Sequence, residues 1–381
     1  MRSAVLTSAL ALAAAARPGV SFALDAKQGV DAGPRDFVAK YVVNGRQYDL
    51  RGHEPSSGTG HPVYMFVAGD QTRVTRYSSD LRFTREMAAR GFVAALVEYP
   101  GMRYPQYRYP QDDVHHEPTV FNLNDEERTS AAEVARRDLT LKCSGANNSL
   151  ITVARDIFSY AGPGDTTSTS AVATLCRRNG VDCSAGVAIH GMSLGGLLSH
   201  YAPQFAPAVS ASLVWSAGNF VPGVESCCSV TGNSSCCDEA DGIIGGSSLD
   251  CMIDSVLSTF LPKSRRRLVI GAADLYYGTN DTTFGAIAQC KRGTGYDCGT
   301  RSDCIQADGS GYYVPSVDDV GGLLHASTGR LGMQGHAFYV DCRSNVYSEK
   351  HELNDDFLEA EEEWGLKRSF DWLARTARQS R

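Results

Sequence analysis

The chain has 381 residues, of which 43% are apolar and 21% charged, and its formal net charge is −7 at pH 7. This composition is typical of a soluble globular protein that is long enough to bury a large core. No repeat recurs at a fixed period, which argues against a solenoid or a propeller, and no concentration of basic residues points to nucleic acid as a partner.

The first residues have the pattern of a secretory signal peptide. Arg2 gives a positive start, and the apolar stretch over residues 4–16 is too short to span a bilayer. Ser21-Phe22-Ala23 resembles a signal-peptidase site, so we expect residues 1–23 to be removed and the protein to be secreted. A buried N-terminal helix is the alternative. No later apolar run is long enough for a transmembrane span, and we expect residues 24–381 to form one domain.

Two further features favour secretion. N-glycosylation sequons begin at Asn147, Asn233 and Asn280. The 12 cysteines all follow the predicted signal peptide, and an even number of cysteines in an oxidising compartment indicates a disulfide framework. Within it, Cys176 and Cys183 are expected to form a local bridge. A metal site is the alternative for the cysteines, but the adjacent cysteine pairs lack the usual zinc spacing with partner histidines.

The first elements of the predicted domain are strands. Two runs rich in β-forming residues meet at Asn44-Gly45, which is a strong signal for a hairpin turn. A buried strand is then predicted over 62–69, a helix over 83–91 and a second buried strand over 92–100. Strand, helix and strand in this order form the crossover unit of a parallel sheet.

The segment over 98–118 is rich in Tyr, Arg and Pro. Tyr99 and the tyrosines that follow it either line a substrate cleft, because loops at strand ends carry recognition, or belong to a proline-stiffened surface loop. The acidic and histidine residues at 112–117 are of metal-ligand type, but no spacing singles them out, so we expect a solvated loop there.

The rest of the chain continues the alternation of strands and helices. Helices are predicted at about 129–141, 149–161, 169–178, 194–206 and 352–377, and strands at 187–189, 211–218, 266–274 and 311–317. This order predicts an α/β fold with a mostly parallel sheet and helices on both faces. Cys-rich stretches at about 219–263 and 275–310 are predicted to be stapled insertions. Trp215 is expected in the core.

A serine lies between one of these strands and the next helix, in the stretch Gly191-Met192-Ser193-Leu194-Gly195. A nucleophilic serine needs exposure at the end of a strand, a base to take its proton and donors for the oxyanion. The glycines two residues before and after Ser193 permit a sharp, strained turn that projects the serine. The amide of Leu194 is expected to be free at the helix N-terminus, where the dipole favours negative charge. A turn of small residues for close helix–strand packing is the alternative.

This strand–turn–helix context, and the order of elements over most of the mature chain, resemble the α/β-hydrolase superfamily, especially its esterase, lipase and dienelactone-hydrolase-like branches. The resemblance implies a catalytic acid and then a histidine downstream of the serine. Asp274, at the end of the predicted strand RRLVIGAAD, resembles the family's acid, and a helix cap or Asx turn is its alternative. His336, in the context Gly-His-Ala-Phe, resembles the family's histidine, with His325 as the alternative.

The resemblance also implies a second amide for the oxyanion hole, in the loop after the strand predicted over 62–69. Gly69 would keep that loop tight, and the backbone amide of Asp70 would donate, with Gln71 as the alternative. Members of the superfamily often have His-Gly at this point, where this chain has Ala68-Gly69. Because the donor is a backbone group, this difference leaves the chemistry intact.

Together these features imply a secreted serine hydrolase that cleaves carboxylic esters through an acyl-enzyme, with no cofactor and no metal. The expected partner is a small-molecule or lipid-like ester, with no nucleic acid. A peptidase, a thioesterase or a lipase on the same fold stays open, because a fold does not fix a substrate. A binding module that kept the fold and lost turnover is a further alternative, against which the presence of all three catalytic residue types argues.

Overall fold

The computed structural model describes residues 33–43, 45–69, 78–99, 149–217, 261–272, 282–316, 319, 338–339 and 353–379. The chain divides into two compact units, Met1–Ala32 and Gly33–Arg381, and every described residue belongs to the second. The predicted signal peptide, the helix predicted over 129–141, most of the stretch over 219–263 and the asparagine of each sequon lie outside the described residues.

A single sheet organises the described part of the chain, with its strands in the order β1-β2-β4-β3-β5-β6-β7-β9-β8. The strands are β1 (Arg35–Val43), β2 (Arg46–Glu54), β3 (Val63–Val67), β4 (Val93–Val97), β5 (Val187–Met192), β6 (Val209–Trp215), β7 (Arg266–Val269), β8 (Asp303–Ile305) and β9 (Gly311–Tyr313). From β4 through β3, β5, β6 and β7 to β9, every neighbouring pair is parallel. The mostly parallel sheet expected from the sequence is confirmed.

The two edges of the sheet are antiparallel. β1 and β2 form the hairpin predicted at Asn44-Gly45, with Val43 opposite Arg46. Gly45 has a φ of 77°, a left-handed conformation that glycine adopts without steric cost. At the other edge the three-residue β8 pairs with β9. The central strands between these edges are buried along their whole length, as expected for strands that are covered on both faces.

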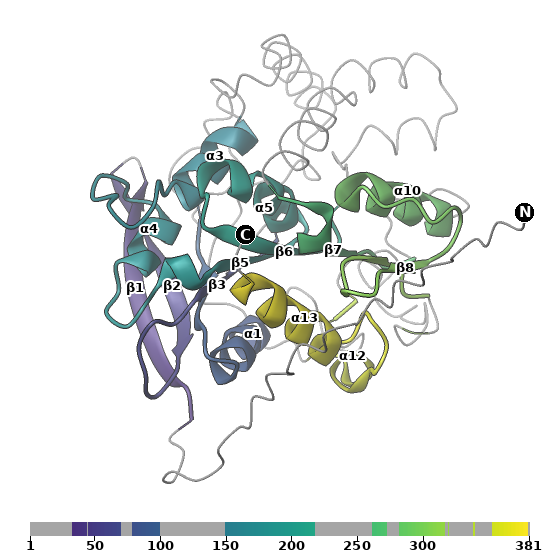
Figure 1. Cartoon of the computed structure of the whole chain (residues 1–381), viewed down its shortest axis with the longest axis horizontal. Helices are drawn as coiled ribbons and strands as arrows, with labels where there is room; N and C mark the ends of the chain where they lie inside the picture. The colour runs from purple at the N-terminus through teal and green to yellow at the C-terminus, as the bar shows by residue number, and fades with distance from the viewer. Residues whose placement is uncertain are drawn as a thin grey trace, which may run out of the picture. The chain divides into compact units, whose positions relative to one another are not determined.

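Helices cover both faces of the sheet (Figure 1). The described helices are α1 (Ser78–Ala89), α3 (Ser149–Phe158), α4 (Ala171–Cys176), α5 (Leu194–Phe205), α10 (Thr282–Thr294), α12 (Asp355–Glu359) and α13 (Leu366–Arg378). Short 3₁₀ turns lie at Cys183–Ala185 and Lys263–Arg265. In Figure 1, α1, α12 and α13 lie on one side of the sheet, and α3, α5 and α10 lie on the other.

Successive side chains of the central strands pack alternately into two separate hydrophobic cores. Val63, Met65 and Val67 pack into the core beneath α3, α4, α5 and α10, whereas Tyr64 and Phe66 pack into the core beneath α1, α12 and α13. This division follows from the two-residue side-chain period of a strand. The second core is rich in aromatic rings, and it contains Trp215, as expected from the sequence.

The predicted helix over 352–377 is in fact two helices, α12 and α13. Gly365 caps the N-terminus of α13, and a β-carbon at Gly365 would lie 2.3 Å from the carbonyl oxygen of Ala360. The chain therefore turns sharply at a place where only glycine fits. Four aromatic residues of this segment are buried, namely Phe357, Trp364, Phe370 and Trp372.

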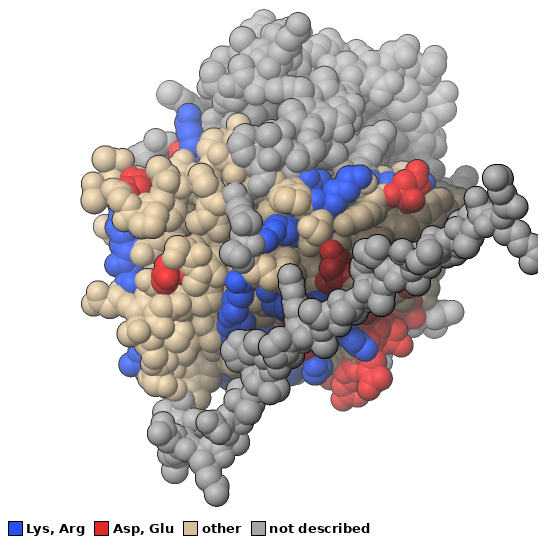
Figure 2. Space-filling model, in the orientation of Figure 1, with Lys and Arg blue, Asp and Glu red and all other residues tan. Residues whose placement is uncertain are grey.

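The charges of this C-terminal segment are segregated along the chain. Figure 2 shows acidic residues gathered around α12, and the exposed glutamates Glu361 and Glu362 follow it. The exposed face of α13 is basic, with Lys367, Arg368 and Arg375. None of the helices in the described ranges is long and apolar enough to cross a membrane.

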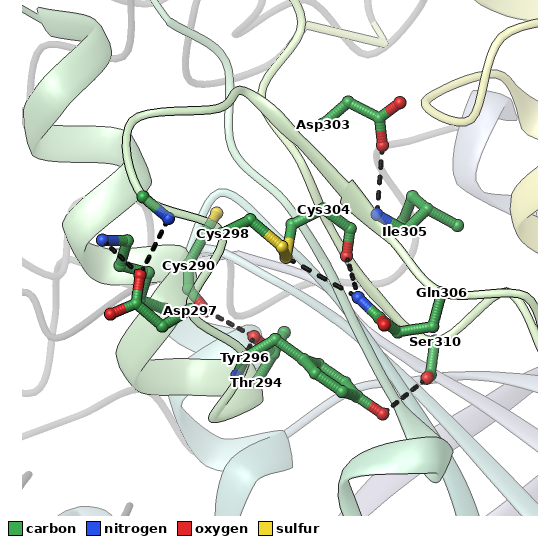
Figure 3. Close-up of a disulfide and its surroundings, with 12 residues drawn as sticks. Cys290, Thr294, Tyr296, Asp297, Cys298, Asp303, Cys304, Ile305, Gln306 and Ser310 are labelled. Carbon is green, nitrogen blue, oxygen red and sulfur yellow. Dashed lines mark hydrogen bonds and ion pairs between the residues drawn. A yellow bond between two sulfur atoms is a disulfide. The ribbon is translucent and has the colours of Figure 1, made fainter.

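Two disulfides lie within the described residues. Cys176–Cys183 links the end of α4 to the turn before β5, which confirms the predicted local bridge. Cys298–Cys304 closes the loop between α10 and β8 (Figure 3). The same loop is held by a hydrogen bond of 2.9 Å between the hydroxyls of Tyr296 and Ser310. A disulfide here limits the freedom of the unfolded loop and so stabilises a very short edge strand.

Cys290 of α10 is a free, buried cysteine close to that disulfide in Figure 3. Burial raises the pKa of its thiol well above the ordinary value. A buried, protonated thiol is a weak nucleophile, so Cys290 behaves as a small apolar core residue.

Candidate active site

Ser193 is the single residue between β5 and α5, and its backbone is strained. Its φ and ψ are 53° and −125°, a conformation that side chains with a β-carbon seldom adopt. The strain is held by two backbone hydrogen bonds, one from the Ser193 amide to the Trp215 carbonyl (3.0 Å) and one from the Leu197 amide to the Ser193 carbonyl (3.0 Å). The serine side chain makes no capping hydrogen bond to the helix. Such a turn presents a serine hydroxyl at the end of a strand.

The positions around Ser193 require glycine, because neighbouring atoms leave no room for a side chain. A β-carbon on Gly191 would lie 2.5 Å from the carbonyl oxygen of Gly195, and one on Gly195 would lie 2.0 Å from that of Val67. A β-carbon on Gly196 would lie 2.3 Å from the β-carbon of Ala217. None of the three has a positive φ. The glycines therefore let α5 approach the strands, while Ser193 itself takes the unusual backbone conformation.

Ser193 lies at the N-terminus of a helix of 12 residues, and Leu194 is its first residue. The first four amides of a helix have no acceptor within the helix, and the helix dipole places partial positive charge there. The Leu194 amide therefore lies in the first turn of α5, at the positive end of the helix dipole. This turn, on a mostly parallel sheet covered by helices on both faces, confirms the α/β-hydrolase fold that the sequence predicted.

The end of β3 lies against Ser193. A β-carbon built on Gly69 would be 3.2 Å from the Ser193 β-carbon and 3.1 Å from the Met192 sulfur. Strand β3 is the direct neighbour of β5, with Val67 opposite Gly191. Gly69 therefore lies beside Ser193, just after the end of β3. The proposed donor Asp70, and Gln71, lie outside the described residues.

Tyr99, the first of the tyrosines expected to line a cleft or to belong to a surface loop, does not lie in a surface loop. Its side chain is buried, and its hydroxyl donates to the carbonyl oxygens of Ala68 (2.8 Å) and Gly69 (2.7 Å). Strand β4 ends at Val97 and lies beside β3, so Tyr99 reaches the turn after β3 from the neighbouring strand. The remaining tyrosines of 98–118, and residues 112–117, lie outside the described residues.

The predicted acid Asp274 also lies outside the described residues, but the chain just before it does not. Strand β7 pairs with β6, and the amide of Ser216 donates to the carbonyl of Val269 (2.9 Å). The chain then continues to the buried Ala272, whose amide donates to the carbonyl of Pro315 (2.9 Å). The chain from β7 to Ala272 is therefore fixed at the carboxyl ends of the parallel strands.

His336 and its alternative His325 lie outside the described residues, but two residues that follow His336 are placed. The rings of Phe338 and Tyr339 are buried, and their centroids lie 5.6 Å and 5.3 Å from that of Trp215. Trp215 is the last residue of β6 and pairs with Met192, the neighbour of Ser193. The chain two residues beyond His336 is thus packed at the same end of the sheet as the serine.

His190, three residues before Ser193, is a core residue that the motif analysis did not single out. Its ring lies 4.0 Å from that of Trp215 and 4.6 Å from that of Phe66, and its Nδ1 is 2.7 Å from the Tyr64 hydroxyl. Burial lowers its pKa well below the ordinary value, so the ring stays neutral. Its position on the same face of the strand as the buried Ala188 would have identified it as a core histidine.

No group of three or more potential metal ligands occurs in the parts of the chain that the structure places. The described part of the site contains the Ser193 hydroxyl, the backbone amides at the start of α5 and packed aromatic rings.

No family model and no curated protein matches this chain. Among solved structures, the chain is similar to an acylaminoacyl peptidase of Pyrococcus horikoshii (12% identity, TM-score 0.36), covering 74% of this chain and only 37% of the peptidase. It is similar to the bacterial brefeldin A esterase (14% identity, TM-score 0.33), covering 78% of this chain and 71% of the esterase. It is also similar to the esterase Est22 with p-nitrophenol (14% identity, TM-score 0.30), covering 63% of this chain and 64% of the esterase.

Proposed function

We propose that this protein is a secreted serine hydrolase that cleaves carboxylic esters through an acyl-enzyme intermediate. The main support for the proposal is the strained backbone of Ser193, the single residue between a buried strand and the N-terminus of a helix. Backbone strain of this kind persists only when the surrounding packing enforces it, and it is concentrated at functional sites. Here the packing of Gly191 and Gly195 enforces it.

In the proposed reaction, the Ser193 oxygen attacks the acyl carbonyl while His336 takes the hydroxyl proton. His336 then gives this proton to the leaving alcohol, and the acyl group remains on Ser193 as an ester. Water attacks that ester with His336 again as the base, which releases the acid and restores the serine. Asp274 orients the imidazole and stabilises its protonated form.

The negative charge on the carbonyl oxygen in both tetrahedral intermediates is held by two backbone amides, those of Leu194 and Asp70. The position of Leu194 at the first turn of α5 supports the first of these roles. The contact between Gly69 and Ser193 supports the second, because Asp70 follows Gly69 directly. Removing one donor of such a pair typically slows catalysis by about 10²- to 10³-fold.

The packing of Phe338 and Tyr339 supports His336 over His325 as the base. Phe338, which packs beside Trp215, follows His336 by two residues, and two residues of extended chain span at most about 7 Å. His325 precedes the same phenylalanine by 13 residues, so this contact does not favour it.

Secretion is supported by the predicted signal peptide and by the two described disulfides, since disulfides persist in oxidising compartments. Peptidase, thioesterase and lipase activities use the same chemistry and are the alternatives to ester hydrolysis. Coenzyme A thioesters are cytosolic, which disfavours a thioesterase in a secreted protein. A lipase would need an apolar lid, and the stretch over 219–263 is rich in Gly, Ser and polar residues.

Turnover of p-nitrophenyl esters from acetate to octanoate tests this proposal. The wild type should release p-nitrophenol, and Ser193→Ala and His336→Ala should each lose at least about 10³-fold in kcat. His325→Ala is the matched control and should keep wild-type turnover. Unchanged turnover in Ser193→Ala would overturn the proposal, and a folded wild type without turnover would favour the binding-module alternative.

A further inference from the structure

The turn after β3 is held between two side chains, Tyr99 from the segment after β4 and Ser193 from the residue between β5 and α5. On one side, the single O–H of Tyr99 is shared between the carbonyl oxygens of Ala68 and Gly69, at 2.8 Å and 2.7 Å. On the other side, Gly69 lies directly against Ser193. A β-carbon on Gly195 would lie 2.2 Å from the Ala68 carbonyl oxygen, so the first turn of α5 also packs on this peptide.

We infer that Tyr99 is a positioning residue that holds the turn after β3 against Ser193. This inference rests on the proposed function. Tyr99 binds the carbonyl oxygens of Ala68 and Gly69 from the side of β4. Because Gly69 lies directly against Ser193, a hydrogen bond that fixes the Gly69 peptide also restrains the position of the serine side chain.

Burial strengthens this restraint. Tyr99 is only 1% exposed, and a buried hydrogen bond is not weakened by competition with water. The tyrosine therefore holds the Gly69 peptide in place beside Ser193, without touching the substrate itself.

A variant that keeps the aromatic ring of Tyr99 but lacks its hydroxyl distinguishes the positioning role from a packing role. Tyr99→Phe keeps the buried ring and deletes only the two hydrogen bonds to Ala68 and Gly69. Tyr296→Phe is the matched control. Tyr296 is a partly buried tyrosine in the loop between α10 and β8, and the substitution deletes its hydrogen bond to the hydroxyl of Ser310. Each variant is measured per active site, counted from the burst of p-nitrophenol or from fluorophosphonate incorporation, so that an unfolded fraction does not count.

The expected result for Tyr99→Phe is a fall in kcat of about tenfold or more for p-nitrophenyl butyrate, with KM within about twofold of wild type. The affinity for butylboronic acid, which forms a tetrahedral adduct on a serine, should fall by a similar factor. Tyr296→Phe should keep wild-type values for all three quantities. A merely structural role would leave kcat per active site and the boronate affinity unchanged.

Wild-type kcat per active site in Tyr99→Phe would overturn the inference while the proposed function stands. An equal loss in Tyr99→Phe and Tyr296→Phe would overturn it as well, because the effect would then be general. If the wild-type protein neither turns over esters nor takes up a fluorophosphonate, the proposed function fails, and the inference about Tyr99 fails with it.

Discussion

Gly69 lies directly against Ser193, because Gly69 has no side chain to separate the two residues. A β-carbon there would lie 3.2 Å from the Ser193 β-carbon and 3.7 Å from its Oγ. The first of these separations is shorter than an ordinary van der Waals contact, so any side chain at residue 69 has to displace the serine or the turn after β3. Two segments far apart in sequence therefore meet at the hydroxyl that the proposed reaction uses.

We predict that Gly69→Ala lowers kcat for p-nitrophenyl butyrate by about 10- to 100-fold, because a displacement of a reacting group by a few tenths of an ångström to 1 Å has effects of this size. The φ of Gly69 is not positive, so the backbone tolerates alanine and the protein should still fold. Gly164→Ala is the control, since nothing lies within 4 Å of its added β-carbon. Wild-type kcat in Gly69→Ala would contradict the contact.

A different outcome is expected for a substitution in the first turn of α5. The β-carbon of a Gly195→Ala variant would lie 2.0 Å from the Val67 carbonyl oxygen, and this clash is with backbone that cannot move aside. We predict a loss of unfolding free energy of about 3 kcal/mol or more, or a failure to accumulate folded protein. Urea unfolding followed by tryptophan fluorescence measures this loss. A midpoint equal to that of the wild type would show that α5 can shift away from β3.

The stability of the protein should fall in mild acid because of a buried histidine on α5. Burial, together with the charge of Arg266, lowers the pKa of His200 from 6.5 to about 4, although a hydrogen bond to Ala217 opposes the shift. The imidazole of His200 therefore takes up a proton near pH 6.5 in the unfolded chain, but only near pH 4 in the folded protein. The stabilisation is complete above pH 6.5 and is lost as the pH falls towards 4, at about 1.4 kcal/mol per pH unit.

His200→Gln tests this pH dependence, because glutamine can still donate a hydrogen bond and does not titrate. Urea midpoints at pH 7.5 and pH 5 give the change in stability for each protein. The drop between the two pH values should be smaller in His200→Gln than in the wild type, by about 2 kcal/mol. Equal drops in the two proteins would show that His200 does not take part.

Arg267 is a buried cation on β7 whose replacement should be costly. Its guanidinium donates to the carboxylate of Glu363 (2.8 Å), to the Glu363 carbonyl and to the carbonyl of Gly309 (3.1 Å), and the side chain is only 1% exposed. Lysine cannot match this forked geometry. We predict that Arg267→Lys lowers the free energy of unfolding by about 2 kcal/mol, because it leaves a buried charge with poorer partners.

The exposed Arg375, which donates to the carbonyl of Asp308, offers the matched comparison for that substitution. Arg375→Lys should change the free energy of unfolding by less than about 0.5 kcal/mol. Similar effects of the two substitutions in urea unfolding would mean that burial does not determine the contribution of Arg267.

The sequence predicted the parts of the fold that depend on local pattern. The hairpin at Asn44-Gly45, the buried central strands and the turn at Ser193 all follow from side-chain period and from glycine placement over a few residues. The bridge between Cys176 and Cys183 is also local. Each of these features needs no knowledge of what lies next to it in space.

The features that the sequence did not predict depend on contacts between distant segments. Tyr99 acquires its role only because β4 lies beside β3 in the sheet, and the sequence does not reveal that Ala68 will present its carbonyl there. Strand β8 has three residues, too few for a period to be visible, and it exists because β9 lies beside it. The acidic segment before Trp364 favours a helix locally, yet the chain turns at Gly365 to bury Trp364 and Phe370.

The most direct test of the account is the site of covalent labelling. The purified protein is treated with a fluorophosphonate and digested, and the modified peptide is located by mass spectrometry. We predict a single adduct on Ser193, absent in Ser193→Ala and strongly slowed in His336→Ala. Labelling of another residue, or labelling that persists in Ser193→Ala, would contradict the claim that Ser193 is the nucleophile.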